Sequence, residues 1–453
     1  MADDGLPTAV RNALAYRHLP SDSLSLYVEN LRTGEPVLVW NEDESRNPAS
    51  VMKILTTLVA LDLLGPTYTW KTDIYLVGKM HDERLDGDLL LKGYGDPYLV
   101  AERLRQMVWS IRHAGISQIT GDLLLDDSYF KVTDYDPAAF DNSPLRSYNV
   151  APNALMMDFK TVHYLFETDL AAEAVNLKFI PVLENLQVVN HLTLKDGRCG
   201  GYQRGITITA NEDVDRVIFS GNFPSSCQSY GMYRTALSHN EFAFGMFKTL
   251  WRESGGQFAG GWKNVIAEDG TEPFLSFESL PLADVITKIN KHSNNVMARQ
   301  ILLTLAAEKF GEPGTVENGR EVVRAWLAER RLDFAELQYV NGAGLSRESR
   351  ITAREVADLL RYAYDSPFMP EFMSSLSLAG MDGTLSGRFR RDPMSGMAHI
   401  KTGSMDDVTA IAGYLQARSG ERYIVVSLQN YKGVHRGTGE EVQEALLRWL
   451  FEM

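Results

Sequence analysis

Long apolar runs are missing from this sequence of 453 residues. No stretch approaches the roughly 18–20 unbroken apolar residues that a membrane-spanning helix needs, so we expect no transmembrane segment. The first five residues, MADDG, are acidic and lack the apolar core of a secretory signal. The sequence therefore predicts either a cytosolic protein or a mature exported protein whose signal has been replaced by an initiator methionine.

Positive charge is also scarce, because 45 lysine and arginine residues stand against 59 aspartate and glutamate residues. The net charge of −14 at pH 7 argues against binding to nucleic acid or to an anionic membrane, since both would repel the protein. Metal-binding patterns are missing too: the nine histidines are scattered, and no H-E-x-x-H motif or close Cys/His cluster occurs. We expect neither a metal ion nor a cofactor.

Cysteine occurs only twice, at Cys199 and Cys227. These two residues could form a disulfide if the protein is exported, but two cysteines can also occur by chance. The sequence leaves their pairing open.

The two ends of the chain carry strand-like segments that suit one sheet. Residues 23–31 alternate in polarity, and residues 37–40 are typical of a returning strand. Three more short strands are predicted near the C-terminus, at residues 398–404, 408–415 and 423–428. An amphipathic helix over about 440–452 could lie on a membrane, but packing on the sheet is favoured. Together the ends predict a single sheet built from both termini.

The middle of the chain, from about 73 to 280, is rich in short strands and turns and is interpreted as inserted material. Within it, residues 102–127 weakly resemble residues 241–269, because each segment has a helix-like run, two glycines and a strand that ends in acidic residues. Helical patterns return at residues 283–308 and 316–330.

The pattern S-x-x-K occurs at Ser50 and Lys53, at the start of a predicted buried helix over residues 50–64. Residues three apart share a helix face, so the Lys53 amine can activate the Ser50 hydroxyl once burial or a nearby cation lowers its pKa. Free N–H groups at the helix start would also favour an oxyanion. A second copy at Ser128 and Lys131 lies in a context that favours strand or loop, so Ser50 is the predicted nucleophile.

A second motif, S-x-N, is common in this chain, but only the copy from Ser293 to Asn295 immediately precedes a long predicted helix. An alternative interpretation is that Ser293 or Asn294 merely caps that helix. His292 adjoins Ser293, but adjacent helical residues point in different directions, so a Ser-His pair is not favoured.

The third motif, Lys401-Thr402-Gly403-Ser404, holds the only K-T-G of the chain and lies on a predicted strand. Glycine in a strand marks a place where another group approaches the backbone closely. A cation, two hydroxyls and a bare backbone form an edge that can bind a carboxylate. Three motifs in this order on these elements indicate a serine nucleophile that forms an acyl-enzyme.

The sequence resembles the class C low-molecular-mass penicillin-binding proteins, the penicillin-binding protein 4 type of D-alanyl-D-alanine carboxypeptidase and endopeptidase, over nearly the whole chain. Besides the three motifs, the matching segments are Gly93-Tyr94-Gly95-Asp96-Pro97, Asn341-Gly342-Ala343-Gly344-Leu345-Ser346-Arg347 and Gly380-Met381-Asp382-Gly383-Thr384-Leu385. The resemblance implies an α/β (α+β) fold of the serine β-lactamase/transpeptidase type, with a five-stranded antiparallel sheet flanked by helices. It also implies a catalytic domain of residues 1–72 and 281–453, an inserted domain II of residues 73–160 and 235–280, and a nested domain III of residues 161–234.

The resemblance implies a mechanism as well. Ser50 attacks the carbonyl between two D-alanines of a peptidoglycan stem peptide, and Lys53 takes its proton. Ser293 and Lys401 relay the proton to the leaving amine, and Asn295 hydrogen-bonds the substrate backbone. Water then hydrolyses the acyl-enzyme, whereas β-lactams would trap the nucleophile as an ester.

Substrate binding follows from the same resemblance. Lys401, Thr402 and Ser404, on the strand that contains Gly403, would hold the terminal carboxylate of the substrate. The backbone N–H groups of Ser50 and Ser404 would form the oxyanion hole.

Four more residues bear on substrate preference. Asp141 and Arg347 would contact the diaminopimelate side chain of the stem peptide. Asn341 stands where the family often has Asp, which removes a charge near the site, and Asp406 occupies a variable position just after K-T-G-S.

The predicted function is a periplasmic serine D-alanyl-D-alanine carboxypeptidase and DD-endopeptidase. Its partners would be peptidoglycan stem peptides, cross-links and β-lactams, with no nucleic acid and at most a loose association with the membrane. One alternative is a β-lactamase, whose chain is shorter and lacks the long insertion between the first two motifs. Another is a cell-wall-binding or sensor protein that keeps the pocket without catalysis.

Overall fold

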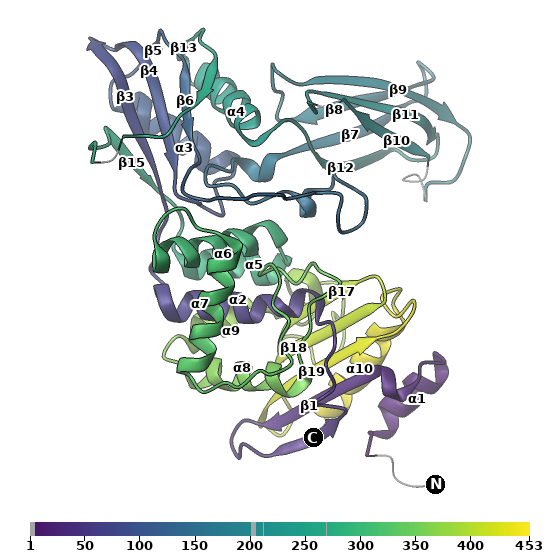
Figure 1. Ribbon diagram of the computed structural model, residues 1–453. Coiled ribbons are helices and arrows are strands. Elements are labelled where there is room, and N and C mark those ends of the chain that lie inside the picture. The colour runs from purple at the N-terminus through teal and green to yellow at the C-terminus, as the bar shows by residue number, and fades with distance from the viewer. Residues whose placement is uncertain (1–4, 201–204, 212, 269) are drawn as a thin grey trace. The chain divides into compact units, whose positions relative to one another are not determined.

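The computed structural model describes residues 5–200, 205–211, 213–268 and 270–453, and the chain folds into two compact units (Figure 1). Unit 1 combines Met1–Thr69 with Leu280–Met453, and unit 2 is the continuous segment Trp70–Ser279. The nucleophile motif and the two later motifs therefore belong to unit 1, and unit 2 is inserted between the first and second motifs. The finer division of that insertion into domains II and III stays a prediction.

Unit 1 is built on a six-stranded antiparallel sheet in the order β16-β17-β18-β19-β1-β2. Its strands are β1 (Leu24–Asn30), β2 (Pro36–Trp40), β16 (Ser377–Leu378), β17 (Ala398–Met405), β18 (Val408–Gln416) and β19 (Arg422–Asn430). β1 pairs with β19, so the purple N-terminal strand lies beside the yellow C-terminal strands in Figure 1. All five predicted strands are present, and the short β16 adds a sixth.

Helices cover both faces of this sheet, which is why β18 is buried along nearly its whole length. They are α1 (Thr8–Tyr16), α2 (Lys53–Leu64), α5 (Leu282–His292), α6 (Asn295–Phe310), α7 (Val316–Glu329), α8 (Ala353–Asp365), α9 (Met369–Ser375) and α10 (Thr438–Phe451). Leu415 packs with the apolar residues of α1 and α10, whereas the neighbouring Tyr414 donates its hydroxyl to the Leu360 carbonyl of α8. The final helix therefore packs on the sheet, as favoured from the sequence.

The helix that follows the nucleophile is buried on all sides from Lys53 to Leu61, as its apolar sequence predicts. α2 ends where Gly65 adopts a left-handed φ of 82°, and Pro66 follows. A short 3₁₀ turn, η2 (Ala49–Met52), precedes α2 and carries Ser50. The helical run predicted over residues 283–308 is two helices, because Ser293 interrupts it with a left-handed φ of 56°.

Unit 2 contains a seven-stranded sheet and the helices α3 (Ala101–His113) and α4 (His239–Glu253). The strands are β3 (Lys71–His81), β4 (Arg84–Gly93), β5 (Gln118–Ile119), β6 (Leu123–Asp126), β13 (Gln257–Phe258), β14 (Trp262–Asn264) and β15 (Leu275–Glu278). The internal resemblance seen in the sequence is structural: α3-β5-β6 and α4-β13-β14 share one order, and β13 and β14 pair in parallel with β5 and β6. Gly260 and Gly121 meet there, since a Cβ on Gly260 would lie 1.9 Å from the Gly121 carbonyl oxygen.

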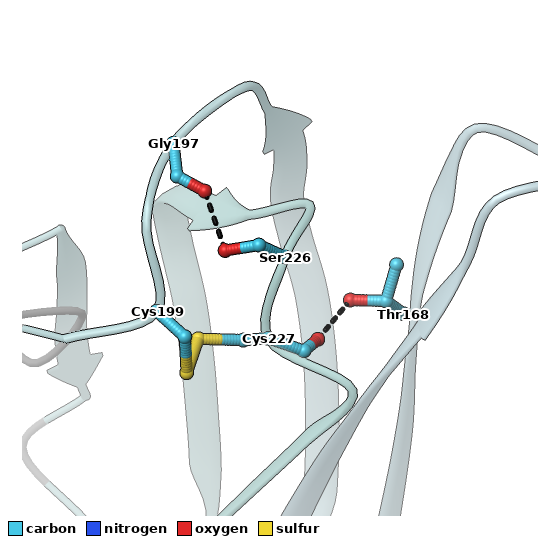
Figure 2. The surroundings of a disulfide bond; sticks show 5 residues. All are labelled: Thr168, Gly197, Cys199, Ser226 and Cys227. Carbon is cyan, nitrogen blue, oxygen red and sulfur yellow. Dashed lines mark hydrogen bonds between the residues drawn. A yellow bond between two sulfur atoms is a disulfide. The ribbon is translucent and has the colours of Figure 1, made fainter.

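The rest of unit 2 forms two three-stranded sheets, β12-β7-β8 and β10-β11-β9. Their strands are β7 (Thr161–Asp169), β8 (Ala174–Ile180), β9 (Gln187–Lys195), β10 (Ile206–Ala210), β11 (Arg216–Pro224) and β12 (Ser229–Thr235). Cys199 and Cys227 form a disulfide that joins the segments leaving β9 and β11 (Figure 2). The Thr168 hydroxyl of β7 donates to the Cys227 carbonyl at 2.5 Å, so the disulfide segment also contacts the first sheet.

Candidate active site

Ser50 and Lys53 face one another at the start of the buried helix. Ser50 lies on η2 and Lys53 is the first residue of α2, so the two residues are three positions apart on one continuous helical segment. The Lys53 Nζ donates to the Ser50 Oγ at 2.8 Å. Ala49, directly before the nucleophile, has a positive φ of 46°, a strained conformation of the kind that gathers at functional sites.

Lys53 is completely buried, and its amine is held by two further acceptors. Nζ donates to the Asn295 Oδ1 at 2.6 Å and to the Ala343 carbonyl at 2.5 Å. Burial, followed by the positive charges of Lys401 and Arg299, lowers the pKa of Lys53 well below its usual value. The site thus favours the neutral amine that can accept a proton from serine.

Ser293 occupies the junction between α5 and α6. It ends α5 in a left-handed conformation, and the neighbouring Asn294 caps α6 by accepting the Met297 N–H at 3.0 Å. The capping alternative therefore holds for Asn294, while the Ser293 Oγ accepts from the Lys401 Nζ at 3.0 Å. His292 is exposed to solvent.

Lys401 is fully buried on β17, and burial lowers its pKa to about 7. Its Nζ also donates to the Thr402 carbonyl at 2.7 Å. The next glycine allows β17 to approach the nucleophile turn: a Cβ on Gly403 would lie 2.4 Å from the Pro48 carbonyl oxygen and 3.1 Å from the Ser50 nitrogen. The close approach predicted from this glycine is confirmed, and Ser404 follows it with an exposed side chain.

The segment from Asn341 to Arg347 completes the surroundings of Lys53. Asn341 accepts the Ala343 N–H at 3.1 Å and donates to the Leu345 carbonyl at 2.9 Å, and this turn aims the Ala343 carbonyl at the lysine. Gly344 is required because a Cβ there would lie 2.0 Å from the Ala49 carbonyl oxygen. Asn341 is therefore suited to its place as an amide, since an ionised Asp could not donate to the Leu345 carbonyl.

The two residues predicted to contact the substrate side chain are both engaged within the protein. Arg347 donates to the Asp406 carbonyl at 3.0 Å and to its carboxylate at 3.3 Å. Asp141 belongs to unit 2, where its carboxylate accepts from the Tyr148 hydroxyl at 2.5 Å and from the Asn149 amide at 2.8 Å. The geometry of unit 1 thus brings together Ser50, Lys53, Ser293, Asn295, Lys401, Thr402, Gly403 and Ser404 at its site.

The competing copy of the first motif does not form such a site. Ser128 lies in a turn after β6, where its N–H donates to the Asp126 carboxylate at 2.9 Å. Lys131 is not on a helix with it. Two contributors to the site were missed from the sequence, the Ala343 carbonyl and Arg299. The Arg299 spacing, four residues after Asn295 on one helix, is the signal that could have found it.

In the described part of the chain, no group of three His, Cys, Asp or Glu side chains is placed to hold a metal ion. Over the same residues, no helix combines the length and the apolar character needed to cross a membrane.

Fold and site together define a serine acyl-transfer enzyme, with an antiparallel sheet flanked by helices and a lysine beside the nucleophile. The chain belongs to the D-Ala-D-Ala carboxypeptidase 3 (S13) family, which it matches over residues 6–453. It is 24% identical to the D-alanyl-D-alanine carboxypeptidase DacB of Haemophilus influenzae, over 91% of this chain and 86% of that protein. It is 28% identical to a D-alanyl-D-alanine carboxypeptidase of an Actinomadura species, over 87% of this chain and 75% of that protein.

Solved structures agree on the fold. The crystal structure of penicillin binding protein 4 (dacB) from Haemophilus influenzae has a TM-score of 0.84 and 22% identity, covering 99% of this chain and 100% of that one. A predatory peptidoglycan endopeptidase from Bdellovibrio bacteriovorus has a TM-score of 0.54 and 15% identity. That match covers 94% of this chain and 92% of the other. The predicted family, fold class and serine carboxypeptidase class are confirmed by these comparisons.

Proposed function

We propose that this protein hydrolyses D-Ala-D-Ala bonds of peptidoglycan stem peptides through an acyl-enzyme on Ser50. The observation that carries the proposal is the contact of 2.8 Å between the fully buried Lys53 amine and the half-buried Ser50 hydroxyl. Because the pKa of Lys53 is lowered, its neutral amine is available to take the serine proton as the hydroxyl attacks. Two relatives that match most of the chain are named D-alanyl-D-alanine carboxypeptidases, which supports this substrate.

Acylation also requires a proton for the leaving amine. Lys401 and Ser293 form the pair that supplies it, since the Lys401 Nζ contacts the Ser293 Oγ at 3.0 Å. The Ser293 hydroxyl passes its proton to the departing nitrogen and is reprotonated from the lysine side. Asn295 accepts from Lys53 through Oδ1, which leaves its amide group to donate to a substrate backbone carbonyl.

The β17 edge binds the substrate. Lys401 supplies positive charge, and the hydroxyls of Thr402 and Ser404 donate to the terminal carboxylate. The backbone N–H groups of Ser50 and Ser404 form the oxyanion hole, a role supported by the close approach of Gly403 to the Ser50 nitrogen. Water then attacks the ester: its hydroxyl leaves on the shortened peptide and its other proton returns to the Ser50 oxygen, while the proton held by Lys53 replaces the one that Lys401 gave to the leaving amine.

The same chemistry extends to cross-links, because carboxypeptidase and endopeptidase reactions both break a bond after D-Ala and differ in the leaving group. Arg347 contacts the side chain of the stem peptide in this proposal, and the same role for Asp141, in unit 2, stays a prediction from the sequence. β-Lactams acylate Ser50 as analogues of the D-Ala-D-Ala unit. A periplasmic location is proposed as well, supported by the Cys199–Cys227 disulfide, which an oxidising compartment favours.

The test is incubation with labelled penicillin followed by peptide mapping, on the wild type, Ser50→Ala and the matched control Ser128→Ala. We expect a single labelled peptide that contains Ser50, retained in the control and lost in Ser50→Ala. Label on Ser128, or label that persists in Ser50→Ala, would overturn the nucleophile.

A second assay measures D-alanine release from an N-acylated peptide that ends in D-Ala-D-Ala. Release that depends on Ser50 supports the proposal. Rapid penicillin turnover with no lasting ester would instead indicate a β-lactamase, and peptide binding without release would indicate a binding protein.

A further inference from the structure

One segment near the site has not yet been given a role, the run Gly380-Met381-Asp382-Gly383-Thr384-Leu385. This segment follows β16 and ends in the 3₁₀ turn η6 (Gly383–Leu385). β16 is the edge strand beside β17, with Ser377 opposite Ile400, one residue before Lys401. The segment therefore starts next to the strand that holds the third motif.

An ion pair fixes this segment to the second motif. The Asp382 carboxylate pairs with the Lys291 Nζ and also accepts the Leu378 N–H at 2.8 Å. Lys291 lies on the last turn of α5, two residues before Ser293. The Asp382 side chain thus ties the loop both to its own strand and to the helix that presents Ser293.

Gly383 lets the loop press against both neighbours. Its φ is 56°, and a Cβ there would lie 2.3 Å from the Ser377 Oγ and 2.7 Å from the Lys291 carbonyl oxygen. Any side chain would strain the backbone and push the loop away from α5 and β16. The ion pair and the glycine therefore determine where the next residue lies.

That next residue is Thr384, which is exposed and whose Oγ1 accepts from the Thr402 Oγ1 at 2.7 Å. It also lies 3.2 Å from the Ser377 Oγ. The hydroxyl of the K-T-G threonine is thus paired with a second hydroxyl that comes from a separate, tightly held loop.

We propose that Thr384 is a substrate-binding residue that recognises the terminal carboxylate together with Thr402, and that Lys291 and Asp382 are its positioning residues. This inference rests on the proposed function, because it needs a substrate with a free carboxylate. Thr402 has a single hydroxyl proton, which it donates to Thr384 in this structure. A bound carboxylate draws the protons of both hydroxyls, so that each of its oxygens receives a charge-assisted hydrogen bond.

The test compares two acyl donors on Thr384→Val, a variant that keeps the side-chain shape and removes the hydroxyl. The first donor is the N-acylated peptide ending in D-Ala-D-Ala, and the second is a matching thioester whose leaving group carries no charge. Losing a hydrogen bond to a charged group should lower kcat/KM for the peptide by about tenfold or more, chiefly through KM. Acylation by the thioester should stay within about twofold, since it never used the carboxylate contact.

Three further variants separate binding from a structural effect. Thr384→Ser should restore most of the peptide activity, because it restores the hydroxyl. Asp382→Asn should reproduce part of the loss on the peptide and spare the thioester. The double variant of Thr384→Val and Thr402→Val should lose less than the product of the two single losses, because both hydroxyls bind one group.

Equal losses on peptide and thioester, or an unchanged peptide KM in Thr384→Val, would overturn the inference. The labelled-penicillin and D-alanine assays on the wild type report on the proposed function separately. If the wild type passes both while Thr384→Val matches it on the peptide, this inference alone fails.

Discussion

Two buried lysines lie beside the nucleophile, and the proposed mechanism needs them in opposite states. Lys53 must be neutral to accept the serine proton, and burial with the charges of Lys401 and Arg299 lowers its pKa toward that state. Lys401 must be cationic to attract the carboxylate, yet burial lowers its pKa to about 7. We expect kcat/KM to fall in acid as Lys53 is protonated, and to fall as pH rises through about 7 as Lys401 loses its charge. A profile of D-alanine release against pH checks both limbs, and a profile flat through neutral pH would contradict this assignment.

The acid limb can be moved by one substitution. Asn295→Asp places a carboxylate where Oδ1 now lies, 2.6 Å from the Lys53 Nζ, and so raises the pKa of Lys53. The limb should move to higher pH, and penicillin acylation at pH values below the limb should fall by about tenfold for every pH unit that the limb moves. Asn294→Asp is the matched control, since it adds the same charge one residue away and Asp caps a helix as well as Asn. An equal displacement of the limb in both variants would show that the effect is not specific to the lysine contact.

Asp406 gives a second prediction for a single side chain. Its carboxylate partly neutralises Arg347 and also lies 3.5 Å from the His435 Nε2. Asp406→Asn should therefore lower KM a few-fold for stem peptides with an acidic side chain, and leave peptides without that acid unchanged. The effect is small because the ion pair is exposed. Steady-state kinetics on the two peptides provide the test, and a rise in KM for the acidic peptide would show that Asp406 helps binding instead.

At the level of elements, the contact between β17 and the nucleophile turn depends on the absence of one side chain. Gly403→Ala would place a Cβ 2.4 Å from the Pro48 carbonyl oxygen. Both β17 and the nucleophile turn meet there through backbone atoms, which cannot relieve the clash by changing a side-chain rotamer. The strand should move away from η2, so penicillin acylation should fall at least tenfold and stability by about 1–3 kcal/mol. Gly387→Ala is the control, because nothing lies within 4 Å of its Cβ. Acylation at the wild-type rate in Gly403→Ala would show that this contact does not matter.

The elements also show how far sequence reasoning reaches. The strands at both ends and the helix after Ser50 were predictable because polarity alternates or is absent over several successive residues. The S-x-N motif indicated a helix start after Ser293, but the pattern over residues 283–308 did not show the break, because a single residue in a left-handed conformation leaves no periodic signal. The Ala343 carbonyl was missed for a different reason: a backbone atom becomes a ligand only through the tertiary fold, and its residue type does not reveal it. Thr384 likewise meets Thr402 only because the loop after β16 folds back onto β17.

For the whole molecule, the division into two units predicts that damage to one need not disable the other. The disulfide joins Cys199 to Cys227 at a sequence separation of 28, entirely within unit 2. Replacing both cysteines by serine should lower the free energy of unfolding of unit 2 by about 3–4 kcal/mol, the value expected from the entropy of closing a loop of that size.

The hydroxyl and carbonyl contacts around the disulfide, from Thr168 and Ser226, join neighbouring segments of unit 2 and cannot replace the covalent constraint (Figure 2). The proposed nucleophile and its lysines belong to unit 1, the other compact unit. Denaturant unfolding followed by proteolysis within Trp70–Ser279 should therefore shift to lower denaturant, while penicillin labelling of Ser50 is retained up to the wild-type concentration. A reducing agent should reproduce the shift in the wild type and leave the double variant unchanged. Parallel loss of labelling and protease resistance would show instead that the two units unfold as one, and that the insertion supports the active site energetically.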